Sequence, residues 1–84
     1  MAAPEKALLV SVAEMQTNQT GLVVRVNAGP GKVNQLHAMG IRPGVVVAKK
    51  SSQPLRGPVI IRVGSTELAL GYGLARRITV RVGP

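Results

Sequence analysis

The 84-residue chain contains no cysteine, no tryptophan and no phenylalanine, and it has a single tyrosine. The absence of cysteine excludes disulfide bonds, thiolate metal ligands and cysteine nucleophiles. The near absence of aromatic rings leaves the core to thirteen valines, eight leucines and four isoleucines. Because β-branched side chains pack well on a pleated surface, this aliphatic composition favours β-strands.

Acidic and imidazole side chains are also scarce, with three glutamates, no aspartate and one histidine. A Ser-His-Asp triad is impossible without aspartate. The glutamates are spread along the chain at Glu5, Glu14 and Glu67, so no carboxylate pair for acid–base catalysis is evident. We therefore expect no catalytic residues and no enzymatic activity.

Basic residues dominate, because eleven lysines and arginines give a net charge of +8. This excess indicates an anionic neighbourhood, which nucleic acid, an acidic partner protein or the inner face of a membrane would supply. No apolar run approaches the roughly 18–20 residues that a membrane-spanning helix needs. The N-terminus lacks the pattern of a signal peptide. We expect a cytoplasmic protein with one small domain over residues 7–84, after a disordered leader over residues 1–6.

The order of elements is predicted from hydrophobic periodicity and turn residues. Ala7–Val12 is expected to be an irregular lead-in strand, and Lys32–Met39 a short amphipathic helix. Leu74–Arg77 is expected to form one helical turn. The main strands are predicted at Gly21–Asn27, Val45–Lys50, Val59–Val63, Thr66–Leu70 and Ile78–Val82.

The first main strand is expected to turn Leu22, Val24 and Val26 toward the core, with Val23 and Arg25 outward. In the last strand, Ile78, Val80 and Val82 alternate with Thr79 and Arg81 in the same manner. The Gly64-Ser65 pair suits a two-residue hairpin turn between the third and fourth strands.

The helix is predicted to stop at Gly40, where glycine accepts a left-handed conformation and Ile41 can fold back onto the last turn. Arg42-Pro43-Gly44 then predicts a type II turn into the next strand. About five short strands with one short helix favour an all-β fold, a small barrel whose closure removes exposed edges.

Several stretches carry a family likeness, and they span most of the chain. They are Gly21–Val26, Leu36–Gly44, Gly57–Val59, Leu68–Leu70 and Ala75–Val80. In these stretches the chain resembles the FeoA family, small cytosolic proteins of bacterial ferrous-iron uptake with an SH3-like β-barrel. The same barrel resembles the C-terminal domain of iron-dependent repressors.

The resemblance implies a non-catalytic accessory protein whose partner is FeoB, a membrane Fe(II) transporter with a cytosolic GTPase domain. The partner would bring this cytoplasmic protein to the inner membrane. The family commonly has basic residues where this chain has Gly71 and Gln35, so a basic contact would come instead from Arg76, Arg77 or Arg42.

Iron binding by the chain itself is not expected. Ferrous sites use histidines with carboxylates, and His37 with Glu14 or Glu67 falls short of such a set. Met15 and Met39 are soft ligands that do not suit Fe(II). We therefore expect no metal ligands and no cofactor.

The basic residues allow two interpretations, a solvated surface or a patch that meets an acidic partner or anionic headgroups. They include Lys49, Lys50, Arg56, Arg62, Arg76, Arg77 and Arg81. The alternative function is a basic nucleic-acid-binding or repressor-type barrel. Against nucleic acid stands the lack of rings for base stacking, since only Tyr72 is present.

Apolar residues at consecutive positions in Val45–Val47 and Val59–Ile61 place an aliphatic side chain on each face of these strands. The outward ones, Val46 and Ile60, are either covered by another part of the chain or form an apolar groove for a partner or a second copy. The candidate partner-binding residues are Leu36, Met39, Ile41, Arg42, Val46, Ile60, Arg76 and Arg77.

Overall fold

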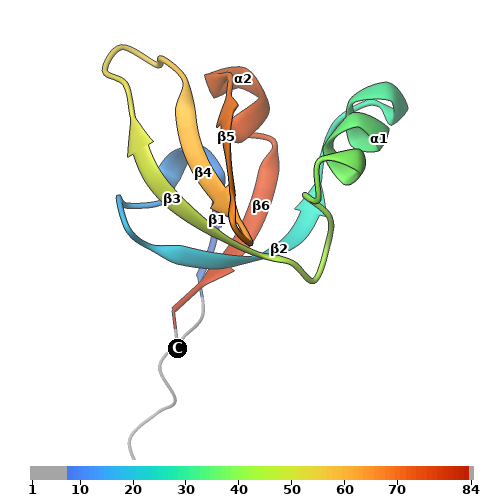
Figure 1. Cartoon of the computed structure of the whole chain (residues 1–84), viewed down its shortest axis with the longest axis horizontal. Coiled ribbons are helices and arrows are strands. Elements are labelled where there is room, and N and C mark those ends of the chain that lie inside the picture. Colours follow the sequence, from blue (N-terminus) through green and yellow to red (C-terminus); the bar gives the residue numbers. More distant parts are fainter. Residues whose placement is uncertain (1–7, 84) are drawn as a thin grey trace, which may run out of the picture.

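The computed structural model describes residues 8–83, which form one six-stranded antiparallel sheet with the order β1-β6-β2-β3-β4-β5 (Figure 1). The strands are β1 (Leu8–Ser11), β2 (Thr20–Val26), β3 (Val46–Ser52), β4 (Val59–Val63), β5 (Thr66–Leu70) and β6 (Ile78–Val82). The helices are the 3-10 turn η1 (Val12–Glu14), α1 (Pro30–Ala38) and α2 (Tyr72–Ala75). The leader expected over residues 1–6 lies outside the described part.

The sheet curls around one core as a small SH3-like barrel, so the predicted all-β fold is confirmed. The strand count is six because the lead-in pairs with β6 through all four of its residues, from Leu8 opposite Val82 to Ser11 opposite Thr79. In Figure 1, α1 stands beside β2, while α2 lies at the end of the barrel between β5 and β6. Neither of these helices is long or apolar enough to cross a bilayer, and residues 8–83 contain no other α-helix.

The connection from α1 to β3 forms as the sequence predicts. Gly40 has φ +92°, and its N–H donates to the His37 carbonyl at 3.0 Å. The Ile41 N–H donates to the Leu36 carbonyl at 2.9 Å, which completes a Schellman motif and brings Ile41 into the core. Gly44 has φ +93°, and the Val45 N–H closes the type II turn on the Arg42 carbonyl at 3.2 Å.

Most strand bounds agree with the prediction, and the differences have local causes. β4, β5 and β6 have the predicted ends, and Gly64 takes the positive φ of +61° that the hairpin requires. α1 begins earlier than expected because Pro30 occupies its first turn after the Gly29 N-cap. β3 runs on to Ser52, since a bulge between Lys49 and Ser51 lets its last residues pair with β4. α2 comprises Tyr72–Ala75, two residues before the predicted turn.

The predicted orientation of β2 is wrong. Val23 and Gly21 face the core, whereas Leu22 is half-buried and Val24 is exposed. Three consecutive apolar residues fit either face, so periodicity alone could not choose between them. A bulge between Val23 and Arg25 then changes the register against β6, and Val26 also packs against the core.

The core is aliphatic apart from one methionine and one lysine ammonium group. Its buried hydrophobic residues are Val12, Met15, Val23, Leu36, Ile41, Val47, Val59, Ile61, Leu70, Ala75, Ile78, Val80 and Val82. Lys49, which the sequence places on the surface, is only 2% exposed. It shares the inward face of β3 with Val47 because side chains alternate along a strand.

The Lys49 ammonium joins β3 to the segment after β1. Its Nζ donates to the carbonyl of Ala13 at 2.8 Å and to that of Met15 at 2.7 Å. Burial lowers the pKa of Lys49 from its ordinary value of 10.5, because removal from water disfavours the charged form. The two carbonyls supply the hydrogen bonds that a buried ammonium requires.

Lys49→Ala is expected to lower the free energy of unfolding by about 2–4 kcal/mol, since it leaves a cavity and two carbonyls without their donor. Urea denaturation of the two proteins measures this difference. Lys50→Ala is the matched control, because Lys50 is the next residue and points outward. Its expected effect is below about 0.5 kcal/mol, and equal losses for both variants would contradict the role given to Lys49.

Gly40→Ala is expected to lower the free energy of unfolding by about 1–2 kcal/mol, because an L-residue is strained in the left-handed region. A Cβ at this position would meet only Val63 Cγ1 at 3.5 Å, so the loss reports backbone strain rather than a clash. Gly31→Ala in the first turn of α1 is the control and should be neutral or stabilising. A neutral Gly40→Ala in thermal denaturation would refute the left-handed stop.

Candidate functional site

A polar hollow of about 450 Å³ opens at the end of the barrel that α2 covers. Its walls come from η1 and its cap, from the end of β2, from α2 and its C-cap, and from β6. The lining residues are Ser11, Glu14, Asn27, Tyr72, Arg76, Arg77 and Thr79. Hydroxyl, amide and guanidinium groups and the Glu14 carboxylate thus converge on one concave surface, which suits a polar ligand.

A second hollow of about 460 Å³ lies between α2 and the start of α1. It is lined by Ala28, Gly29, Lys32, Gly73, Leu74 and Arg77. Small residues and the half-buried Leu74 give it an apolar floor, with Lys32 and Arg77 as its cations. Because Arg77 lines both hollows, we treat them as one surface, called the basic groove.

The position of Arg77 is held by the backbone around it. Its carbonyl accepts a hydrogen bond from the Asn27 N–H at 2.8 Å, and its Nη1 donates to the Asn27 carbonyl at 3.5 Å. The Arg77 N–H donates to the Leu74 carbonyl at 3.0 Å. These bonds tie the end of β2 to the segment after α2, so the two sides of the basic groove are fixed relative to each other.

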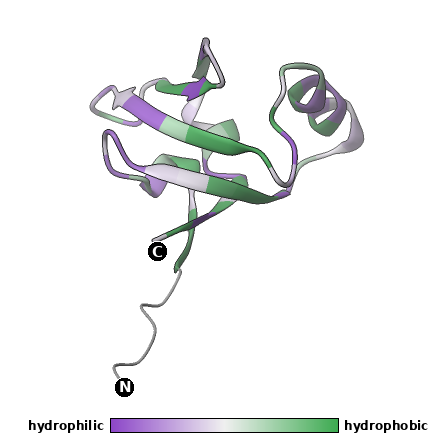
Figure 2. Cartoon of the chain, turned by 60° about the horizontal axis from the view of Figure 1, so that its bottom comes forward, coloured by the Kyte–Doolittle hydropathy of each residue, from purple (hydrophilic) through white to green (hydrophobic). Residues whose placement is uncertain are grey.

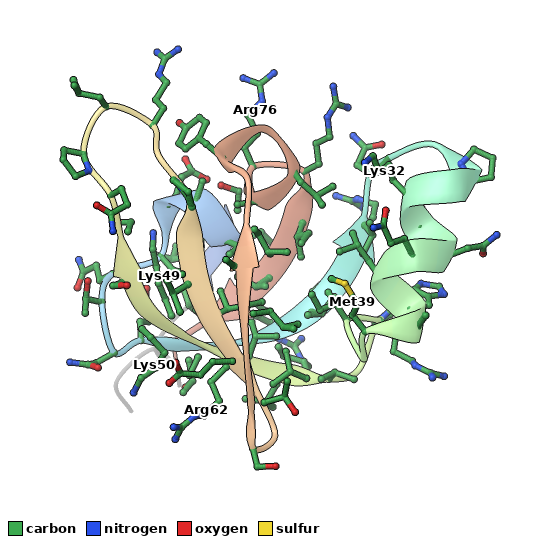
Figure 3. The ribbon with its side chains drawn as sticks, turned by 45° about the horizontal axis from the view of Figure 1, so that its top comes forward. Lys32, Met39, Lys49, Lys50, Arg62 and Arg76 are labelled. Atoms are coloured by element: carbon green, nitrogen blue, oxygen red, sulfur yellow. The ribbon has the colours of Figure 1, made fainter. Side chains whose placement is uncertain are left out.

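The cations of the basic groove have no carboxylate partner among residues 8–83. The ion pair found in this part joins Arg62 to Glu67 at 3.4 Å, on β4 and β5. Figure 3 shows Arg76 and Lys32 at one end of the molecule, with Lys50 and Arg62 at the opposite end. Glu14 is the carboxylate in the groove, and its Oε1 accepts the Ser11 N–H at 2.8 Å in a capping box.

Tyr72, the one aromatic residue, lies on the wall of the polar hollow. The guanidinium carbon of Arg56 lies 5.8 Å from the centre of its ring, which is a cation–π distance. Arg56 therefore adds a further cation beside the groove and covers part of the ring.

A row of outward side chains, apolar except for Arg81 and called the apolar row, crosses four strands on another face of the barrel. The register places Leu9 opposite Arg81, Arg81 opposite Leu22, and Leu22 opposite Val46. Leu9 is 60% exposed and Val46 is 57% exposed. Figure 2 shows two long front strands that become more hydrophobic toward the end nearest α1.

The structure separates the predicted partner-binding residues into buried and surface positions. Leu36 and Ile41 are fully buried, so they shape the core and present no surface to a partner. Met39 is half-buried and packs against the core between α1 and the sheet (Figure 3). Arg42 and Val46 are exposed and Ile60 is half-buried.

Arg76 and Arg77 both line the basic groove, and both side chains are exposed. Val46 and Ile60 do not share one groove, because Ile60 lies opposite Ser51 whereas Val46 lies opposite Leu22. Sequence reasoning missed Lys32 and Leu22. Lys32 could have been found from its place just after the Gly29-Pro30-Gly31 break, which opens α1.

No group of three or more histidine, aspartate or glutamate side chains lies close enough together in the described chain to hold a metal ion. The single histidine of the chain, His37, is half-buried on α1. The side chains that line the groove offer hydrogen bonds and charge for recognition.

Ile41→Ala is expected to lower the free energy of unfolding by about 2–5 kcal/mol, the usual cost of a cavity at a buried isoleucine. Val46→Ala removes an exposed side chain, and its expected effect is within about 0.5 kcal/mol. Chemical denaturation of both variants tests the division between core and surface. A stable Ile41→Ala protein would contradict the role given to Ile41 in the core.

A known protein family and a solved structure match most of this chain. The family model described as the FeoA domain matches residues 10–82. A search of curated proteins found no match. A crystal structure described as the iron uptake regulatory protein FeoA is 38% identical, with a TM-score of 0.81, over 88% of this chain and 97% of that one.

Two other kinds of solved structure share the barrel. A Stenotrophomonas maltophilia FeoA complexed with zinc, described as an SH3 domain protein, is 23% identical with a TM-score of 0.72 over 83% of this chain and 87% of its own. A manganese-dependent transcriptional repressor is 19% identical with a TM-score of 0.82, over 94% of this chain but 44% of its own. At such identities these likenesses show the fold alone. The match over residues 10–82 and the 38% identity over nearly all of a solved FeoA show that the chain belongs to the FeoA family.

Proposed function

We propose that this protein is a non-catalytic accessory of ferrous-iron uptake that acts by direct contact with the cytosolic part of a FeoB-type transporter. The observation that carries the proposal is the FeoA match over residues 10–82, because that family consists of small proteins associated with ferrous-iron transport. The proposal agrees with the description of the Stenotrophomonas maltophilia protein, which shares the fold, as a candidate activating factor for ferrous iron transport.

Two features of the surface support action by contact. The apolar row of Leu9, Leu22 and Val46 offers side chains that a partner can cover, and exposed apolar patches commonly mark protein interfaces. The net charge of +8 increases the rate of encounter with an acidic partner and favours one orientation of docking. Arg81 places a cation between Leu9 and Leu22 in the row.

The role is tested by deleting the gene and measuring uptake of radiolabelled Fe(II). The deletion strain is expected to take up less Fe(II), and the wild-type gene to restore uptake. Val46→Lys is expected to restore it only partly, because a lysine would bring a charge into an apolar contact. Val46 is exposed, so the variant should remain folded.

Gln53→Lys in the β3–β4 loop is the matched control, since it adds the same charge at an exposed site beyond the end of β3 that lies far from Val46. It is expected to restore uptake fully. Pull-down of the cytosolic part of the transporter by the purified proteins should follow the same order. Normal uptake in the deletion strain would contradict the proposed function, and full restoration by Val46→Lys would remove the apolar row from the interface.

A further inference from the structure

We propose that the basic groove binds an acidic segment of a partner protein, in which carboxylates flank one aliphatic side chain. The carboxylates would pair with Arg76, Arg77 and Lys32, and the aliphatic side chain would enter the second hollow against Leu74. This inference gives the interaction proposed above a site and a ligand chemistry. It rests on that proposal only for the identity of the partner.

Charge complementarity is the first argument. Arg76, Arg77 and Lys32 line the two hollows without a carboxylate partner in residues 8–83. A guanidinium group binds a carboxylate through two parallel hydrogen bonds, which gives both strength and orientation. The one acid in the groove, Glu14, accepts the Ser11 N–H through its Oε1 and forms no ion pair with Arg76 or Arg77.

The second argument is the division of the groove into a polar and an apolar part. The hollow beside Tyr72 is lined by polar and charged groups, whereas the one beside Leu74 combines small and aliphatic residues with the cations Lys32 and Arg77. Their volumes, about 450 and 460 Å³, each suit a few side chains. A small inorganic anion would bind only in the hollow beside Tyr72. A peptide in which acidic and aliphatic side chains alternate would bind in both hollows.

The third argument is that the groove is held in shape before binding. The hydrogen bonds between Asn27 and Arg77 fix the end of β2 against α2. Leu74 packs against the core, and Ala75 beside it is fully buried. A ligand would therefore order the arginine side chains but not the backbone, which limits the entropic cost of binding.

Nucleic acid fits the same groove less well. Single strands bind by stacking bases on aromatic rings. The groove has one such ring, that of Tyr72, and Arg56 lies over it at 5.8 Å. The apolar floor beside Leu74 has no counterpart in a sugar–phosphate backbone, so a peptide is the favoured ligand.

The test uses the full chain and a fluorescent synthetic peptide in which glutamates flank a single leucine, with binding measured by fluorescence anisotropy. Replacing both Arg76 and Arg77 by alanine is expected to weaken binding at least about tenfold, through the loss of charge-assisted hydrogen bonds. Both side chains are exposed, and circular dichroism checks that the variant is folded. Replacing the peptide leucine by serine should also weaken binding.

The matched control replaces Lys50 and Arg62 by alanine, which removes the same charge outside the groove, at the opposite end of the molecule (Figure 3). It is expected to bind the peptide within about twofold of the wild type, since distant surface charges are screened by salt. An equal loss in this control would show attraction by net charge alone and overturn the site. Tighter binding of an oligothymidylate than of the peptide, abolished by the Arg76 and Arg77 changes, would make the groove a nucleic-acid site.

The same variants separate this inference from the proposed function. If the Arg76 and Arg77 double variant loses the peptide and also loses the cytosolic part of the transporter in pull-down, the groove is the transporter site. If the double variant still binds the transporter as the wild type does, the proposed function stands. The groove is then not the transporter site, and its assignment as that site is overturned. If the wild type binds the peptide but not the transporter, the proposed partner is wrong while the peptide site stands.

Discussion

The fold depends on filling a barrel with aliphatic side chains and no aromatic ring. Valine, leucine and isoleucine are smaller than the rings they replace, so the strands must approach closely for the core to be dense. Gly21 shows this closeness, because a Cβ there would lie 2.9 Å from Val80 Cγ2. At the other end of β2 a bulge after Val23 adjusts the register so that Val26 also reaches the core.

The same constraint explains why one lysine lies inside. Beyond Val47, the inward face of β3 meets the carbonyls of Ala13 and Met15 rather than apolar groups, and an ammonium satisfies both. The other lysines and arginines of the described part are exposed or half-buried, which leaves a strongly basic surface. The interior supplies stability and the surface supplies binding, through the apolar row and the basic groove.

The shared barrel also explains why metal-dependent repressors resemble this chain at 19% identity or less while the FeoA likeness reaches 38%. The fold is common to both groups, and an aliphatic core tolerates many exchanges of similar volume. What a barrel of this kind binds depends on the side chains that its surface carries. Here those side chains are the cations on either side of α2 and the exposed leucine and valine residues of β1, β2 and β3.

The sequence by itself determined the features that depend on neighbouring residues. The left-handed stop at Gly40, the type II turn at Gly44 and the hairpin at Gly64 follow from local backbone preferences, and the short strands follow from aliphatic runs between them. The tertiary structure alone decided which face of β2 is buried, that Lys49 is internal, and that Val46 and Ile60 lie apart. It also brought Lys32, Arg76 and Arg77 to one groove. These outcomes depend on strand register and on contacts between distant segments, which no local pattern encodes.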